Sequence, residues 1–212
     1  MPHLMPRHAS DIRAALEPYR DLLLFVAAML FADAFWKLTV HGDDTSVSVS
    51  WLCFDLTPFF DALARHTAES VYALLHNFKP ELYLSDSLVL GYTGGSGTHI
   101  AWSCTPVKQA FIFTAIILAA QPYLIQDSRA LHKLWFVPLG IALIYIVNIL
   151  RIAVIVLIIE HRPDLFSVFH NGVLKYLFYG FIFCLWLQWI VMSAPSISQA
   201  SSDDTAPTAD TD

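Results

Sequence analysis

The sequence predicts an all-α membrane protein, a polytopic bundle of about four transmembrane helices with an amphipathic helix and a short extended segment on its outer face. Its composition is the first observation behind this fold class. Of the 212 residues, 56% are hydrophobic and 14% are charged, and the mean hydropathy is +0.55. The second observation is the recurrence of apolar runs near the length of about 20 residues that crosses a bilayer. Both observations indicate that most of the apolar side chains face lipid.

Charge and cysteine usage exclude several function classes. The formal net charge is -6 and no cluster of Lys and Arg is present, so we expect no nucleic-acid partner. The three cysteines, Cys53, Cys104 and Cys184, lack the CxxC or Cys/His spacing of a zinc site, so we expect no metal and no other cofactor. A disulfide between Cys53 and Cys104 is an open alternative that would remove a reactive thiol.

The first span is predicted at Leu22–Val40. It follows residues 1–21, which carry Arg7, Arg13 and Arg20, and basic flanks favour the cytoplasmic side. A cleaved signal peptide is the alternative, with small residues at 32–34 as the cleavage site. We favour an uncleaved anchor because apolar residues continue beyond that site.

Residues 41–99 are expected to lie outside the membrane. Residues 41–55 are polar, and the next stretch has helical periodicity with charged residues between the apolar ones. Its apolar positions are Leu56, Phe59, Phe60, Leu63, Val71, Leu74, Leu75 and Phe78. We predict an amphipathic helix on the outer surface, with His66 and His76 as solvated or capping residues. A short extended pair with glycine-rich turns follows at 82–97.

The second span, Pro106–Tyr123, begins beside a cysteine. Pro106 suits the first turn of a helix and Thr105 is a good N-cap. Cys104 then precedes a helix N-terminus, where unpaired N–H groups and the helix dipole stabilise a thiolate. A buried cysteine that only packs is the alternative.

The last two spans carry the other polar residues of interest. After a basic turn at 121–133, Trp135–Ile159 contains Arg151 and, on the same helical face, Asn148. A polar linker at 160–171 holds His170, and the last span is predicted at Val173–Met192. Residues 193–212 are predicted to be a disordered acidic tail. The membrane domain is therefore 22–192.

The positive-inside rule orients this bundle with both termini in the cytoplasm of a multi-pass plasma-membrane protein. Cys104, Arg151 and His170 then fall at one depth on the outer face. An arginine within a span is a functional candidate by default. The three residues suit thiol acyl transfer, with Cys104 as nucleophile, His170 as proton carrier and Arg151 stabilising the oxyanion. Asn148 could hold Arg151 or His170, while His99 and His161 compete with His170 as base.

These segments also resemble a known family. A cysteine opening a span, the segment Asn148-Ile149-Leu150-Arg151-Ile152 and His170-Asn171-Gly172 resemble the exosortase/archaeosortase family of membrane-embedded cysteine transpeptidases. The resemblance covers residues 100–189. It implies that Cys104, Arg151 and His170 are catalytic. The family commonly has Cys-Ser-Gly where this chain has Cys104-Thr105-Pro106.

The function that follows is an outward-facing cysteine protease or transpeptidase. The resemblance implies that it cleaves a C-terminal sorting signal, such as the Pro-Glu-Pro type, from membrane-anchored protein substrates and transfers them to a lipid or glycan acceptor. One alternative is a membrane acyltransferase with Cys104 as thioester carrier. Another is a non-catalytic assembly or transport subunit in which Cys104 packs and Arg151 pairs with Asp55, Asp86 or a headgroup.

Overall fold

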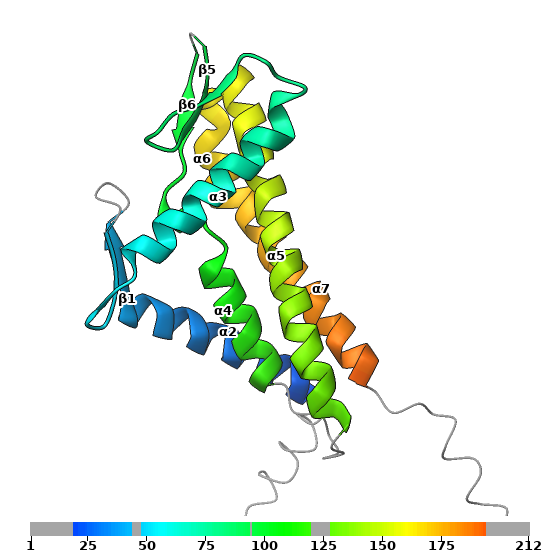
Figure 1. Ribbon diagram of the computed structural model, residues 1–212. Coiled ribbons are helices and arrows are strands. Elements are labelled where there is room, and N and C mark those ends of the chain that lie inside the picture. Colours follow the sequence, from blue (N-terminus) through cyan, green and yellow to red (C-terminus); the bar gives the residue numbers. More distant parts are fainter. Residues whose placement is uncertain (1–18, 44–47, 94, 120–127, 194–212) are drawn as a thin grey trace, which may run out of the picture.

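The structure, a computed structural model, is mainly helical and describes residues 19–43, 48–93, 95–119 and 128–193 (Figure 1). The elements in chain order are α2 (Arg20–Thr39), β1 (Val40–Asp43), β2 (Ser48–Trp51), β3 (Phe54–Asp55), α3 (Thr57–His76), β4 (Leu82–Leu84), β5 (Val89–Tyr92), β6 (Gly97–His99), η2 (Trp102–Cys104), α4 (Val107–Ala119), α5 (Ser128–His161), η3 (Pro163–Leu165), α6 (Phe166–Val168), η4 (Phe169–Val173) and α7 (Leu174–Ser193). The predicted cytoplasmic segment is described only from residue 19, and nearly all of the predicted tail lies outside the described residues.

Three helices in the described ranges are long and apolar enough to cross a membrane: α2, residues 134–161 of α5, and α7. The remaining predicted span, Pro106–Tyr123, corresponds to α4, a mostly apolar helix of 13 residues. Residues 120–123 of that span lie outside the described residues. Helix α4 packs against α2, α5 and α7, with Ile112, Phe113, Ile116 and Ile117 almost fully buried. The structure therefore agrees with a membrane protein.

The predicted amphipathic helix is present as α3, which runs from the end of the first sheet to the upper end of α5 (Figure 1). Ala64, Ala68, Val71 and Leu75 of its apolar face are buried with β4 and α5, and Phe60 is buried against Trp36 of α2 and Trp102. His66 is exposed and forms a hydrogen bond with the Tyr145 hydroxyl of α5. This contact joins the amphipathic helix to the helix that carries Arg151.

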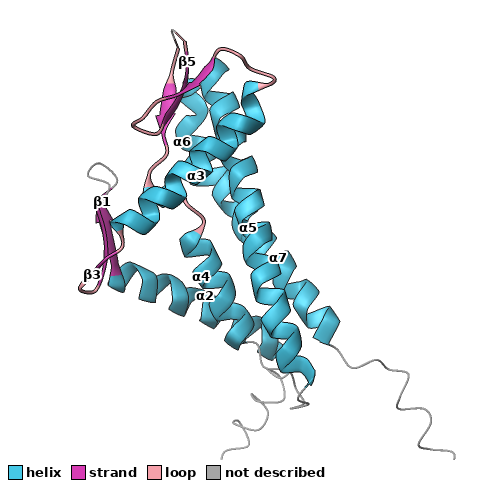
Figure 2. Cartoon of the chain, in the orientation of Figure 1, coloured by secondary structure: helices cyan, strands magenta, loops and turns pink. Residues whose placement is uncertain are grey.

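The all-α prediction is wrong in one respect, because two three-stranded antiparallel sheets accompany the helices (Figure 2). The extended pair predicted at 82–97 becomes β4 and β5, and β6 adds a third strand. The first sheet was not expected, since residues 41–55 are polar enough to resemble a loop. The sequence does indicate this sheet in one place: polar and apolar residues alternate in Ser48-Val49-Ser50-Trp51, as in a strand with one buried face, and Val49 is buried.

The polar linker predicted at 160–171 is mostly helical in the structure. Helix α5 continues to His161, and the chain then runs through η3, α6 and η4 directly into α7. A helical path gives the backbone N–H and C=O groups partners at membrane depth, which an irregular linker would not. His170 is therefore held by a helical segment.

Candidate functional site

Cys104 ends a short 3-10 turn between β6 and α4. Its backbone N–H donates to the Ala101 carbonyl at 2.9 Å, and its side chain is half-buried against the outer core formed by α3, the second sheet and α5. The predicted N-cap is wrong: the Thr105 hydroxyl donates backward to the Trp102 carbonyl at 2.7 Å. The Pro106 carbonyl instead accepts the bond from Ala110 N–H at 2.9 Å. Cys104 still precedes the start of α4.

Asn148 ties α5 to the cysteine turn. Its side chain is fully buried and its Nδ2 donates to the Cys104 carbonyl at 2.9 Å. Asn148 was expected to hold Arg151 or His170, and the structure shows its contact with Cys104 instead. Within the described part of the chain, the Asn148 Oδ1 has no hydrogen-bond partner. The residue therefore fixes the backbone that carries the thiol.

Arg151 lies one helical turn beyond Asn148 on α5. Its guanidinium carbon is 6.0 Å from the centre of the Phe178 ring of α7, a cation–π distance. It is also close enough to Cys104 for the two to interact electrostatically. Among the described residues no carboxylate forms an ion pair with Arg151, and its buried Nε lacks a hydrogen-bond partner. The guanidinium is thus available to an anion at the site.

His170 lies on a π-helical turn, η4, immediately before α7. Its ring stacks on Phe166 with centroids 5.1 Å apart and the planes inclined by 17°. Single π-helical turns are rare and often occur at functional sites, because the widened turn reorients a side chain. Sequence periodicity carries no signal for such a turn, and the sequence analysis missed it.

The three predicted residues line one small cavity. Cys104, Arg151 and His170 share it with four neutral side chains, Thr98, Ile100, Ile152 and Ile155. They come from η2, α5 and η4, segments far apart in the sequence. His99 and His161 are exposed and are absent from its described lining. Of the three candidate bases, the structure thus brings His170 to Cys104.

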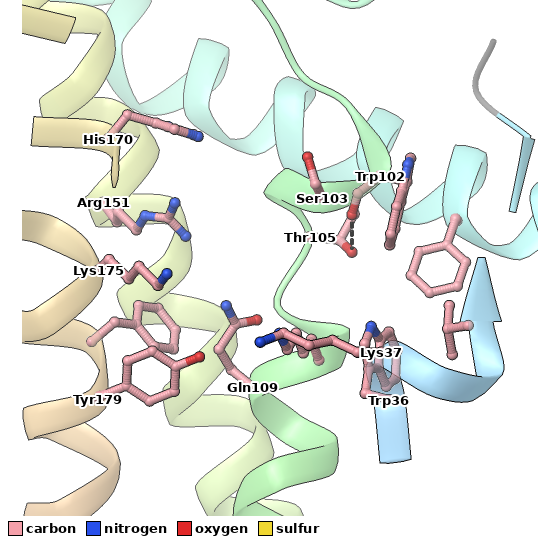
Figure 3. A pocket seen from close by; sticks show the side chains of 14 residues that line it. Trp36, Lys37, Trp102, Ser103, Thr105, Gln109, Arg151, His170, Lys175 and Tyr179 are labelled. Atoms are coloured by element: carbon pink, nitrogen blue, oxygen red, sulfur yellow. Dashed lines mark hydrogen bonds between the residues drawn. The ribbon is translucent and has the colours of Figure 1, made fainter. Parts of the chain in front are cut away.

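A second cavity of about 360 Å³ adjoins the first, and Arg151 and His170 line both (Figure 3). Arg151, His170 and Lys175 enter it from the α5 and α7 side, across from Trp102 and Ser103 of the cysteine turn (Figure 3). Lys37 of α2 and Lys108 of α4 also line it. The sequence analysis did not single out Lys108 or Lys175, although both stand near the start of a predicted span.

The thiol of Cys104 shares its cavity with an imidazole and a guanidinium. Cys53 and Cys104 form no disulfide, so the alternative that would block the thiol is not observed. No group of three His, Cys, Asp or Glu side chains in the described ranges could hold a metal ion. A thiol, an imidazole and a guanidinium at one cavity are the groups that thiol acyl transfer needs.

Comparison of the chain with known proteins finds no match among family models, curated proteins or solved structures.

Proposed function

We propose that the chain is a membrane cysteine peptidase or transpeptidase that acts on exported proteins carrying a C-terminal sorting signal. One observation carries the proposal: Cys104, Arg151 and His170, from three separate segments, line the same cavity. The resemblance of the same three segments to the exosortase/archaeosortase family supports it. The site is proposed to face the outer side of the plasma membrane, where exported substrates would reach it.

The reaction has two acyl transfers. The Cys104 thiolate attacks the scissile carbonyl carbon, and Arg151 stabilises the negative oxygen of the tetrahedral intermediate. The C–N bond breaks as the protonated His170 imidazole gives its proton to the leaving amine, which leaves a thioester on Cys104. A lipid or glycan hydroxyl or amine, or water, then attacks the thioester while His170 takes its proton. The acyl group leaves and the thiolate is regenerated.

The site also has polar groups that would position this chemistry. The Asn148 amide holds the Cys104 carbonyl at 2.9 Å, so the thiol is attached to a fixed backbone. Neutral side chains, Ile100, Ile152 and Ile155, form much of the remaining wall. An apolar wall strengthens the electrostatic interaction between a guanidinium and a developing oxyanion.

Substrate trapping tests the proposal. A Cys104→Ala chain would replace the intact one in its native cells, and mass spectrometry would quantify the C-terminal peptides of exported, membrane-anchored proteins. We expect unprocessed C-termini to accumulate, and the intact chain to carry a hydroxylamine-sensitive adduct on Cys104. Cys184→Ala, an exposed thiol of α7, is the matched control and should process normally. Normal processing by Cys104→Ala would refute the proposal.

A further inference from the structure

The cavity beside the candidate thiol is strongly cationic. Lys37, Lys108, Lys175 and Arg151 line it, and none of its described lining residues is acidic. Asp33 of α2, behind the wall, binds both Lys37 at 2.7 Å and Lys108 at 2.6 Å. Asp33 supplies one negative charge against the four positive charges of the lining, which leaves an excess of positive charge in a region that α2, α4 and α7 place at the membrane.

Three buried polar atoms of the residues that line this cavity have no hydrogen-bond partner among the described residues. They are the Trp102 Nε1 and Arg151 Nε donors and the Gln109 Oε1 acceptor. A buried donor without a partner destabilises the fold. A bound oxyanion would satisfy the Arg151 donor, and a hydroxyl of the same ligand would satisfy Gln109, which lies on the same side of the cavity (Figure 3).

An apolar cavity of about 220 Å³ adjoins the cationic one and shares Trp36, Val40 and Phe60 with it. Its remaining lining comes from α2, β2, α3 and α4 and is apolar apart from Thr39: Phe35, Thr39, Trp51, Leu56, Phe59, Val107 and Phe111. A ligand that fills both cavities must have an anionic end and an apolar end. The outer end of α2 forms part of both walls, so the bilayer can supply such a ligand directly.

We propose that the two cavities form a binding site for an anionic phospholipid, with its phosphate-bearing headgroup among Lys108, Lys175 and Arg151 and part of an acyl chain in the apolar cavity. The guanidinium and ammonium groups bind phosphate oxygens, and each cation near an anionic lipid contributes to binding. Lipid binding requires no reaction at Cys104, so the site stands independently of the proposed function.

Native mass spectrometry of the Cys104→Ala protein tests this site. The protein would be purified in mild detergent and mixed with phosphatidylglycerol, with phosphatidylcholine of the same chains, or with glycerol 3-phosphate as headgroup alone. We expect phosphatidylglycerol to be retained about tenfold more than phosphatidylcholine, and glycerol 3-phosphate not to displace it. A Lys108→Gln, Lys175→Gln double variant should lower that retention about tenfold.

Two further variants separate the site from general lipid affinity. Lys79→Gln removes a lysine that pairs with Glu160 at 2.7 Å and does not line the cavity, so it should retain phosphatidylglycerol normally. Val107→Phe fills the apolar cavity, so it should weaken the binding of phosphatidylglycerol without creating affinity for glycerol 3-phosphate. Equal retention of the two lipids, displacement by glycerol 3-phosphate, or unchanged retention in the double variant would each overturn the proposal. Loss of processing by Cys104→Ala bears only on the proposed function.

Discussion

At the scale of single residues, the position of the candidate nucleophile depends on one buried amide. Replacing Asn148 with alanine removes the 2.9 Å hydrogen bond to the Cys104 carbonyl and leaves that carbonyl without this donor. Leaving a buried polar group unsatisfied costs about 1–3 kcal/mol. We therefore expect Asn148→Ala to lower the thermal unfolding temperature in detergent, and to increase the alkylation rate of Cys104 as the turn loosens.

Thr114→Val is the matched control for Asn148→Ala. The Thr114 hydroxyl donates to the Ala110 carbonyl within α4, at 2.8 Å, and among the described residues no hydrogen bond joins it to the cysteine turn. The control should change neither measurement appreciably. If Asn148→Ala leaves both unchanged as well, Asn148 does not position the thiol.

Arg151 should also control the reactivity of the thiol. A nearby cation favours the thiolate, which is the form that reacts with iodoacetamide. In a background without Cys53 and Cys184, we expect Arg151→Met to slow the alkylation of Cys104 at neutral pH several-fold. Arg151→Lys, which keeps the charge, should retain most of the rate. Equal rates in all three proteins would show that the electrostatic interaction has no effect on the thiolate.

At the scale of secondary-structure elements, α4 and α5 meet at a glycine. A Cβ built on Gly140 of α5 would lie 2.3 Å from two ring atoms of Phe113, which is fully buried in α4. Overpacking of this kind costs about 1–3 kcal/mol, and small residues commonly permit close helix contacts in membranes. We expect Gly140→Ala to lower the unfolding temperature. Gly180→Ala in α7, where the added methyl meets nothing within 4 Å, should be neutral or mildly stabilising, as judged by thermal unfolding in the same detergent.

A second link between elements joins Tyr92 of β5 to Glu160 of α5. Burial and the neighbouring Glu160 carboxylate raise the pKa of Tyr92 in β5 to about 12. The unfolded chain ionises tyrosine near pH 10, so this group favours the fold below about pH 10 and its contribution is lost as the pH rises through about 12. We expect Glu160→Gln to lower the pKa of Tyr92, measured as the phenolate absorbance that Tyr92→Phe abolishes. An unchanged titration would show that Glu160 does not act on Tyr92.

An element can be predicted from the sequence when its buried residues recur with a regular period. Helix α3 was predicted because its apolar residues recur on one face. Phe60, Val71 and Leu75 of that face are buried, whereas Phe59, Leu74 and Phe78 are exposed. The first sheet was missed because its strands are short and, among its described side chains, Val49 alone is fully buried. Charge-based topology places Cys104, Arg151 and His170 at one depth of the membrane, but not next to one another. The π-helical turn under His170 and the Asn148 contact could not be predicted, because both depend on tertiary packing.

At the scale of the whole molecule, the remaining question is which side of the membrane the site faces. The three long apolar helices and α4 agree with a membrane protein, and the basic residues before α2 and near 121–133 predict a cytoplasmic location for those segments. The second sheet, α3 and the site would then lie outside. This orientation matters for function because exported proteins reach an outward-facing thiol only.

Cysteine labelling in intact cells tests this orientation. In a chain without its three native cysteines, Ser87→Cys places a thiol on the exposed turn between β4 and β5, and Ser201→Cys places one in the C-terminal tail. We expect a membrane-impermeant maleimide to label Ser87→Cys in intact cells, and to label Ser201→Cys only after the membrane is permeabilised. The reverse pattern would put the thiol, the arginine and the histidine in the cytoplasm. That result would exclude processing of exported proteins while leaving the phospholipid site intact, since anionic lipids are present on both sides of a bilayer.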